Sequence, residues 1–225
     1  MLKPVSTQRR RTLFKRLGWV LATVGGVSLG VILCALFFQK AGDRCEELKS
    51  LNNAKGIYLA LKMYAGDHDG RFPDAAENAN EAYRQLVPAY IPSTKTFQVR
   101  GSAWTPSASA NFKQDSKVLH PGENHFAYIS CLKDNSNPDF PLVADGFVEG
   151  KPGTYAANRE EKGGVWKGRL AIVVRVDGSG RLEKVNPTDR RVYRTTTTQG
   201  PGIDLFAPAP NWLDAGQLAL NPASR

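Results

Sequence analysis

The sequence has few of the residues that most often carry metal or nucleophilic chemistry. Among its 225 residues are three histidines and three cysteines, and no two cysteines lie two to four residues apart to complete a zinc site with the histidines. His120 and His125 are interpreted as a loop residue and a strand-edge residue. We therefore predict no catalytic residue, no metal site and no cofactor.

Acidic residues are absent before residue 17, where six basic residues gather: Lys3, Arg9, Arg10, Arg11, Lys15 and Arg16. They supply most of the net charge of +9, so the rest of the chain carries only +3. A surface of that charge, without a basic patch interleaved with aromatic residues, argues against nucleic acid as a partner.

Charged residues are absent altogether from Leu17 to Phe38. As a helix this segment would span roughly 33 Å, the thickness of a bilayer core, so residues 17–38 are predicted to be a transmembrane helix with membrane lipid as a partner. The basic flank predicts a bacterial inner-membrane, single-pass protein, with residues 1–16 in the cytoplasm and the C-terminal domain in the periplasm.

Proline is absent between Pro4 and Pro73, and apolar residues outside the predicted membrane segment recur at helical spacing. These residues are Leu48, Leu51, Ala54, Tyr58, Leu61 and Ala65. The pattern predicts a nearly continuous helix of about 50 residues, whose first half lies in the membrane and whose second half is amphipathic.

Three acid–base residues, Asp67, His68 and Asp69, stand at the end of this periodic segment. Residues two apart on a helix point about 200° away from each other, so the two carboxylates cannot face one ligand. The Gly70 that follows favours a turn. We therefore interpret the cluster as the end of the helix and not as a metal or general-base site.

The rest of the chain alternates short apolar runs with turn-forming residues. A helix is predicted at Asn80–Val87 and a brief strand at Thr96–Val99. The runs HFAYISCL, PLVADGF and LAIVVRV are predicted to be strands, and the last continues through Asp-Gly-Ser-Gly into RLEKV as a hairpin. Residues 195–225 are predicted to form a mostly irregular tail.

Several of these segments together resemble the type IV pilins and the pseudopilins of type II secretion. The most specific is CEELKSLNNAKGIYLALKMYAGDHDGRFP, which is followed by EAYRQLVPAYIPSTKTFQV, NHFAYIS, PLVADGF and the hairpin. The resemblance implies an α+β, pilin-like fold, in which a long N-terminal helix packs on a small antiparallel β-sheet within residues 39–194. It also implies a non-enzymatic structural or assembly role in a type II secretion or pilus-like system, with other pilin-like subunits as partners.

The resemblance further implies a processing site for a prepilin peptidase. Gly18 matches the residue before the cut and Trp19 the aromatic residue after it, while Thr23 stands where the family has a glutamate. In the family that carboxylate would neutralise the N-terminal amine of a neighbouring subunit. Its replacement here leaves open whether the protein joins a filament or acts alone.

Two alternatives stay open at the level of sequence. Cys45 and Cys131 form a disulfide in an oxidising compartment, or they are separately buried small side chains. The competing function is a stand-alone, membrane-tethered periplasmic binding protein or hydrolase. A hydrolase would require a nucleophile and a base placed together on ordered elements.

Overall fold

The structure is a computed structural model that describes residues 34, 38, 41–106, 118–194 and 202–224. The chain divides into two compact units, residues 1–45 and 46–225, and nearly all the described residues belong to the second. The second unit is α+β and contains a five-stranded sheet, a two-stranded sheet and the helices that cover them.

A helix covers residues 41–67, which corresponds to roughly 40 Å. Ala54, Leu61 and Ala65 lie on one face of it and are fully buried, as the spacing of apolar residues predicts, and Ile57, which that spacing did not include, is fully buried as well. The helix ends at Asp67, as expected from the turn-forming residues that follow.

The prediction of a helix of about 50 residues with a transmembrane first half is wrong. Within the described part of the chain, no helix is long and apolar enough to cross a membrane. The helix over 41–67 carries charged residues along its length, among them Arg44, Lys49 and Lys55. The single-pass inner-membrane placement, with a cytoplasmic N-terminus and a periplasmic domain, depended on that span and is corrected with it. Residues 17–38 themselves lie outside the described residues, apart from Cys34 and Phe38.

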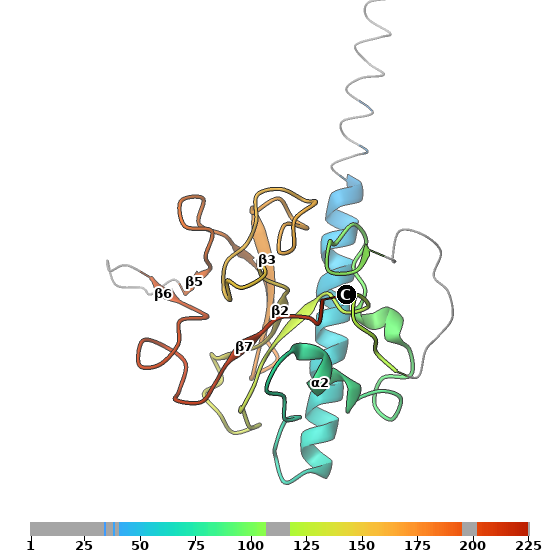
Figure 1. Ribbon diagram of the computed structural model, residues 1–225, viewed down its shortest axis with the longest axis vertical. Coiled ribbons are helices and arrows are strands. Elements are labelled where there is room, and N and C mark those ends of the chain that lie inside the picture. The colour runs from blue at the N-terminus through green and yellow to red at the C-terminus, as the bar shows by residue number, and fades with distance from the viewer. Residues whose placement is uncertain (1–33, 35–37, 39–40, 107–117, 195–201, 225) are drawn as a thin grey trace, which may run out of the picture. The chain divides into compact units, whose positions relative to one another are not determined.

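The main sheet is antiparallel and has the strand order β4-β3-β2-β1-β7 (Figure 1). Its strands are β1 (Phe126–Ile129), β2 (Pro141–Asp145), β3 (Leu170–Arg175), β4 (Gly180–Lys184) and β7 (Ala219–Leu220). The first four fall where the sequence predicts strands. In β1 and β2 every residue is buried, which indicates that both faces of the centre of the sheet are covered.

The helix packs closely against the β3–β4 hairpin because the turn contains glycine. A Cβ on Gly178 would lie 2.8 Å from the Tyr58 ring, and one on Gly180 would lie 2.7 Å from the Lys55 side chain. The Tyr58 hydroxyl donates a hydrogen bond to the Val176 carbonyl at 3.1 Å. The hairpin predicted from sequence therefore also forms the surface against which the helix packs.

A second layer of short elements covers β1. The helix α2 (Ala79–Arg84) carries Tyr83, whose hydroxyl donates to the Ala127 carbonyl at 2.8 Å. The segment that follows is the 3-10 helix η1 (Thr94–Phe97), so the strand predicted at Thr96–Val99 is wrong. Tyr83, Tyr128 and Phe97 form a buried aromatic cluster.

The C-terminal segment takes part in the fold. The strands β5 (Tyr193–Arg194) and β6 (Ile203–Asp204) form the small sheet, and β7 pairs with β1. The side chain of Asn221 accepts from the backbone of Phe147 and donates to Val148. Of the tail predicted at 195–225, the described residues 202–224 are thus anchored at several points.

Candidate functional site

The predicted processing site lies outside the described residues. Gly18, Trp19 and Thr23 all fall there, so peptidase processing stays a prediction. Cys45 and Cys131 are both exposed, and both are free thiols in the structure. Their disulfide also stays a prediction.

The acid–base cluster at the end of the helix forms local contacts only. Asp67 accepts a hydrogen bond from the Tyr90 hydroxyl at 2.8 Å, and the ring of His68 stacks on that of Tyr64 at 3.7 Å. Asp69 has a positive φ of 52°, which places it in the turn. In the described part of the chain, no group of three His, Cys, Asp or Glu residues could hold a metal ion.

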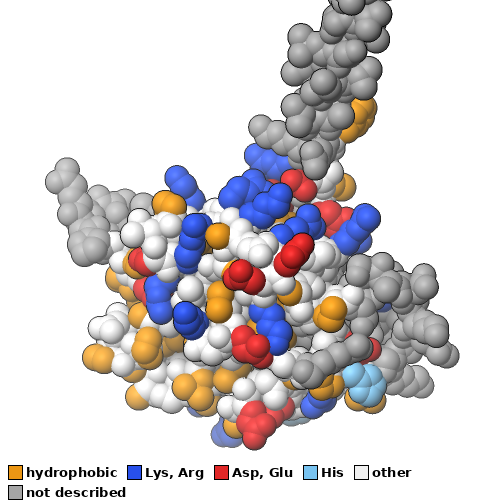
Figure 2. Space-filling view, turned by 45° about the horizontal axis from the view of Figure 1, so that its top comes forward, with side chains coloured by type: hydrophobic (Ala, Val, Ile, Leu, Met, Phe, Trp, Pro, Cys, Tyr) orange, Lys and Arg blue, Asp and Glu red, His pale blue; other side chains and the backbone are white. Residues whose placement is uncertain are grey.

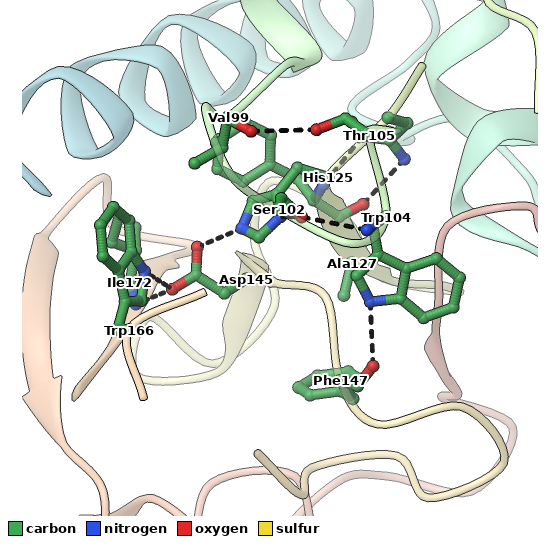
Figure 3. A network of polar contacts seen from close by, with 12 residues as sticks. Val99, Ser102, Trp104, Thr105, His125, Ala127, Asp145, Phe147, Trp166 and Ile172 are labelled. Atoms are coloured by element: carbon green, nitrogen blue, oxygen red, sulfur yellow. Dashed lines mark hydrogen bonds and ion pairs between the residues drawn. The ribbon is translucent and has the colours of Figure 1, made fainter. Parts of the chain in front are cut away.

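A chain of hydrogen bonds joins Ser102, His125 and Asp145 in the interior (Figure 3). The Ser102 Oγ lies 2.6 Å from His125 Nδ1, and His125 Nε2 lies 2.8 Å from Asp145 Oδ1. Ser102 follows η1, His125 immediately precedes β1 and Asp145 ends β2. The serine, the histidine and the aspartate are 4%, 0% and 1% exposed, respectively.

The second carboxylate oxygen of Asp145 is also fully engaged. Its Oδ2 accepts from the indole N–H of Trp166 and from the backbone N–H of Ile172, both at 2.7 Å. One carboxylate therefore ties the end of β2 to three other segments of the chain. Nearby, burial raises the pKa of Tyr155 well above its usual range, and the charge of Asp145 adds to this effect.

The order serine–histidine–aspartate is that of a nucleophile, a base and an orienting acid. Such a serine must touch its substrate, yet Ser102 is buried and its Oγ also accepts from the backbone N–H of Trp104 at 3.2 Å. The Trp104 indole in turn donates to the Phe147 carbonyl at 3.0 Å. This arrangement is suited to fixing the loop after η1 onto the sheet.

The sequence does not indicate this network. His125 was interpreted as a strand-edge residue, although it is fully buried between two hydrogen-bond partners. Ser102 and Asp145 lie 23 and 20 residues away from it, so no short motif joins the three. The one available signal was Asp145, a charged residue at the end of a strongly apolar run.

The most prominent apolar feature of the described surface lies on the helix. Leu48, Leu59 and Met63 are 55%, 60% and 59% exposed. At about 100° per residue they fall within roughly 60° of one another, so all three point away from the sheet. Leu59 and Met63 lie on neighbouring turns, and Leu48 lies about 16 Å farther along the helix, beyond the exposed Asn52 and Lys55. Elsewhere, Figure 2 shows hydrophobic side chains spread among polar and charged ones.

A shallow pocket of about 520 Å³ lies beside β5 and β6. Its lining residues are Arg191, Tyr193, Gly202, Ile203, Asp204, Ala207, Pro208 and Asn211. The Arg191 guanidinium and the Asp204 carboxylate pair with each other, so the opposite charges in its wall are mutually neutralised.

Comparison with family models, with curated proteins and with solved structures finds no match for this chain. The buried network and the exposed stripe on the helix are the features of the described residues that bear on function.

Proposed function

We propose that the protein is a non-enzymatic structural subunit that acts by association with other pilin-like subunits, in a type II secretion or pilus-like system. The observation that carries the proposal is the apolar stripe of Leu48, Leu59 and Met63, which we name the helix stripe. Large apolar side chains exposed together on one face are typical of surfaces that become covered by a partner.

The energetics favour association through this stripe. Full burial of a leucine or methionine side chain stabilises by roughly 1.5–3 kcal/mol, and each of these three is already partly covered. Covering all three would contribute on the order of 3–5 kcal/mol, which suits a repeated contact within an assembly better than a tight isolated pair. The opposite face of the same helix is occupied by the sheet, so only the stripe is available.

The buried network supports the same conclusion. Ser102 and His125 are the best-placed nucleophile and base in the described chain, and both are held inside the domain. The Ser102 oxygen contacts both His125 and the backbone N–H of Trp104, and the side chain is almost fully buried.

In-cell photo-crosslinking tests the proposal. A photo-reactive amino acid at position 59 or 63 should give adducts with other pilin-like subunits, whereas the same group at the buried position of Ile57 should not. Leu59→Lys and Met63→Lys should each lower the yield of adducts formed from position 48. Thr188→Lys is the matched control, because Thr188 is exposed in the turn after β4 and does not belong to the helix.

Adducts that persist unchanged in both lysine variants would contradict the proposal, as would the absence of any adduct from the stripe. Mass spectrometry of the mature N-terminus tests the predicted processing separately. A chain beginning at Trp19 would support handling by a prepilin peptidase, and an intact Met1 would count against it.

A further inference from the structure

The strand β4 forms one edge of the main sheet, and its hydrogen-bonding pattern defines an outer side. In the ladder with β3, the backbone N–H of Arg175 donates to Ser179 and that of Val185 donates to Arg169. Antiparallel partners alternate between pairs that exchange hydrogen bonds and pairs that do not. The register therefore directs the backbone groups of residues 181 and 183 toward β3.

The same alternation directs the N–H and C=O groups of Gly180, Leu182 and Lys184 away from the sheet. Within the part of the chain that the structure describes, these groups have no hydrogen-bond partner. Leu182 is only half-buried, so the edge is accessible over the middle of the strand. A row of unpaired backbone groups of this kind is a template for another strand.

The side chains around this edge are basic. Arg181 and Lys184 are exposed, and so is Lys55 of the helix, which lies against Gly180. None of these three cations has an ion-pair partner among the described residues. The acidic residue of the strand, Glu183, pairs with Arg175 at 2.6 Å, so its negative charge is neutralised and the edge stays basic.

We propose that the β4 edge binds an acidic segment of another protein, which adds to the sheet as a sixth, extended strand. Backbone hydrogen bonds to residues 180, 182 and 184 would hold the segment, and its carboxylates would meet Arg181 on one face and Lys184 with Lys55 on the other. This surface is separate from the helix stripe, and the inference does not depend on the proposed function.

A second copy of the chain fits this edge less well than an acidic segment. Antiparallel pairing of two β4 strands about Leu182 would place Lys184 of one copy opposite Gly180 of the other, where Lys55 already lies. The same register would place Arg181 opposite Glu183, whose carboxylate is already paired with Arg175. Like charges directly opposite each other are destabilising in a sheet. Basic residues on an edge thus discourage pairing with an identical edge while they favour an acidic strand.

Fluorescence anisotropy with the full-length protein tests the inference. The probe is a labelled peptide of repeated Val-Glu-Glu, which as an extended strand carries glutamate on both faces. Two comparison peptides carry lysine in place of glutamate, or methyl groups on the backbone nitrogens of one edge. The glutamate peptide should bind, with an affinity that falls as salt rises, and both comparison peptides should bind at least about tenfold more weakly.

Variants of the protein separate backbone pairing from charge. Leu182→Pro removes an outward N–H and leaves the ladder with β3 intact, so it should weaken binding about tenfold without unfolding the domain. Arg181→Glu should weaken binding at least as much, and Lys95→Glu, an exposed cation on η1, should have no effect. Thermal unfolding of each variant verifies that the fold is retained.

Three results would overturn the inference. They are equal binding of the glutamate and lysine peptides, undiminished binding of the methylated peptide, and no binding of any peptide. A dimer of the free protein that is lost in Leu182→Pro would assign the edge to a second copy and would equally refute an acidic partner.

Discussion

Replacing Asp145 by alanine should be among the most destabilising single changes in the domain. The substitution removes the acceptor of three buried donors, which are the ring of His125, the indole of Trp166 and the backbone N–H of Ile172. A buried donor left without a partner costs about 1–3 kcal/mol. The histidine can relieve its part of the cost by changing tautomer, so we expect a total loss of roughly 3–5 kcal/mol.

The loss is large relative to the stability of a typical domain, which is about 5–15 kcal/mol. In a domain of this size it corresponds to a fall in melting temperature of roughly 10–15 °C. Urea unfolding followed by tryptophan fluorescence gives the free energy, and thermal unfolding gives the melting temperature. Asp145→Asn should lower the unfolding free energy less than Asp145→Ala does. Its amide oxygen can accept from Trp166 and Ile172, and its N–H can donate to the other tautomer of His125.

Asp139→Ala is the matched control for this experiment. Asp139 pairs with Arg194 at 2.7 Å, but both side chains are about 40% exposed, and an exposed pair contributes at most about 1 kcal/mol. If Asp145→Ala lay within about 0.5 kcal/mol of Asp139→Ala in unfolding free energy, the buried network would not be what fixes the loop after η1.

Three further predictions concern other parts of the domain. A fluorophosphonate probe should not label Ser102 in the folded protein, and labelling that His125→Ala abolishes would show an active nucleophile. Gly178→Ala should lower the unfolding free energy in urea by about 2 kcal/mol, because its φ is +81° and the new Cβ would press on the Tyr58 ring. An unchanged unfolding midpoint would contradict the close packing of the helix against the hairpin. The pKa of Glu81 lies below its ordinary 4.5, chiefly because the backbone N–H of Glu77 donates to it. The ionised Glu81 therefore stabilises the folded state fully above pH 4.5, and this stabilisation is lost as pH falls through the lowered pKa. The difference in unfolding free energy between the wild-type protein and Glu81→Gln should therefore shrink in acid. A constant difference across this pH range would refute the assignment.

The longer elements of the fold are predictable because their sequences carry a clear hydrophobic pattern. Leu61 and Ala65 follow the 3.6-residue repeat and are buried, and β2 and β3 are runs of β-branched and apolar residues. The strands β5, β6 and β7 have two residues each, too few to show any alternation. These short strands form because a partner strand lies beside them in the folded structure. The residues around them in the sequence do not show that the partner will be there.

The two surfaces proposed for association illustrate the same limit. Leu48 belongs to the apolar repeat of the helix, yet it is exposed while Ile57, from the same helix, is fully buried. Nine residues separate the two, so at about 100° per residue their side chains point to opposite faces of the helix. Helical spacing gives these relative directions but does not show which face the sheet covers. The free edge of β4 likewise depends on which strands flank β3, and strand order is set by long-range pairing.

The buried network shows why hydrogen-bond geometry alone does not identify an active site. Ser102, His125 and Asp145 have the residue types and the distances of a catalytic relay, but catalysis requires in addition that the nucleophile meet a substrate. Here Ser102 and His125 are buried and hydrogen-bonded to partners from the loop after η1 and the end of β2. A carboxylate that accepts three hydrogen bonds in the interior stabilises only the one arrangement that supplies all three donors. The interior thus specifies the fold, and the groups left without partners, the helix stripe and the outer side of β4, lie on the surface where another protein can reach them.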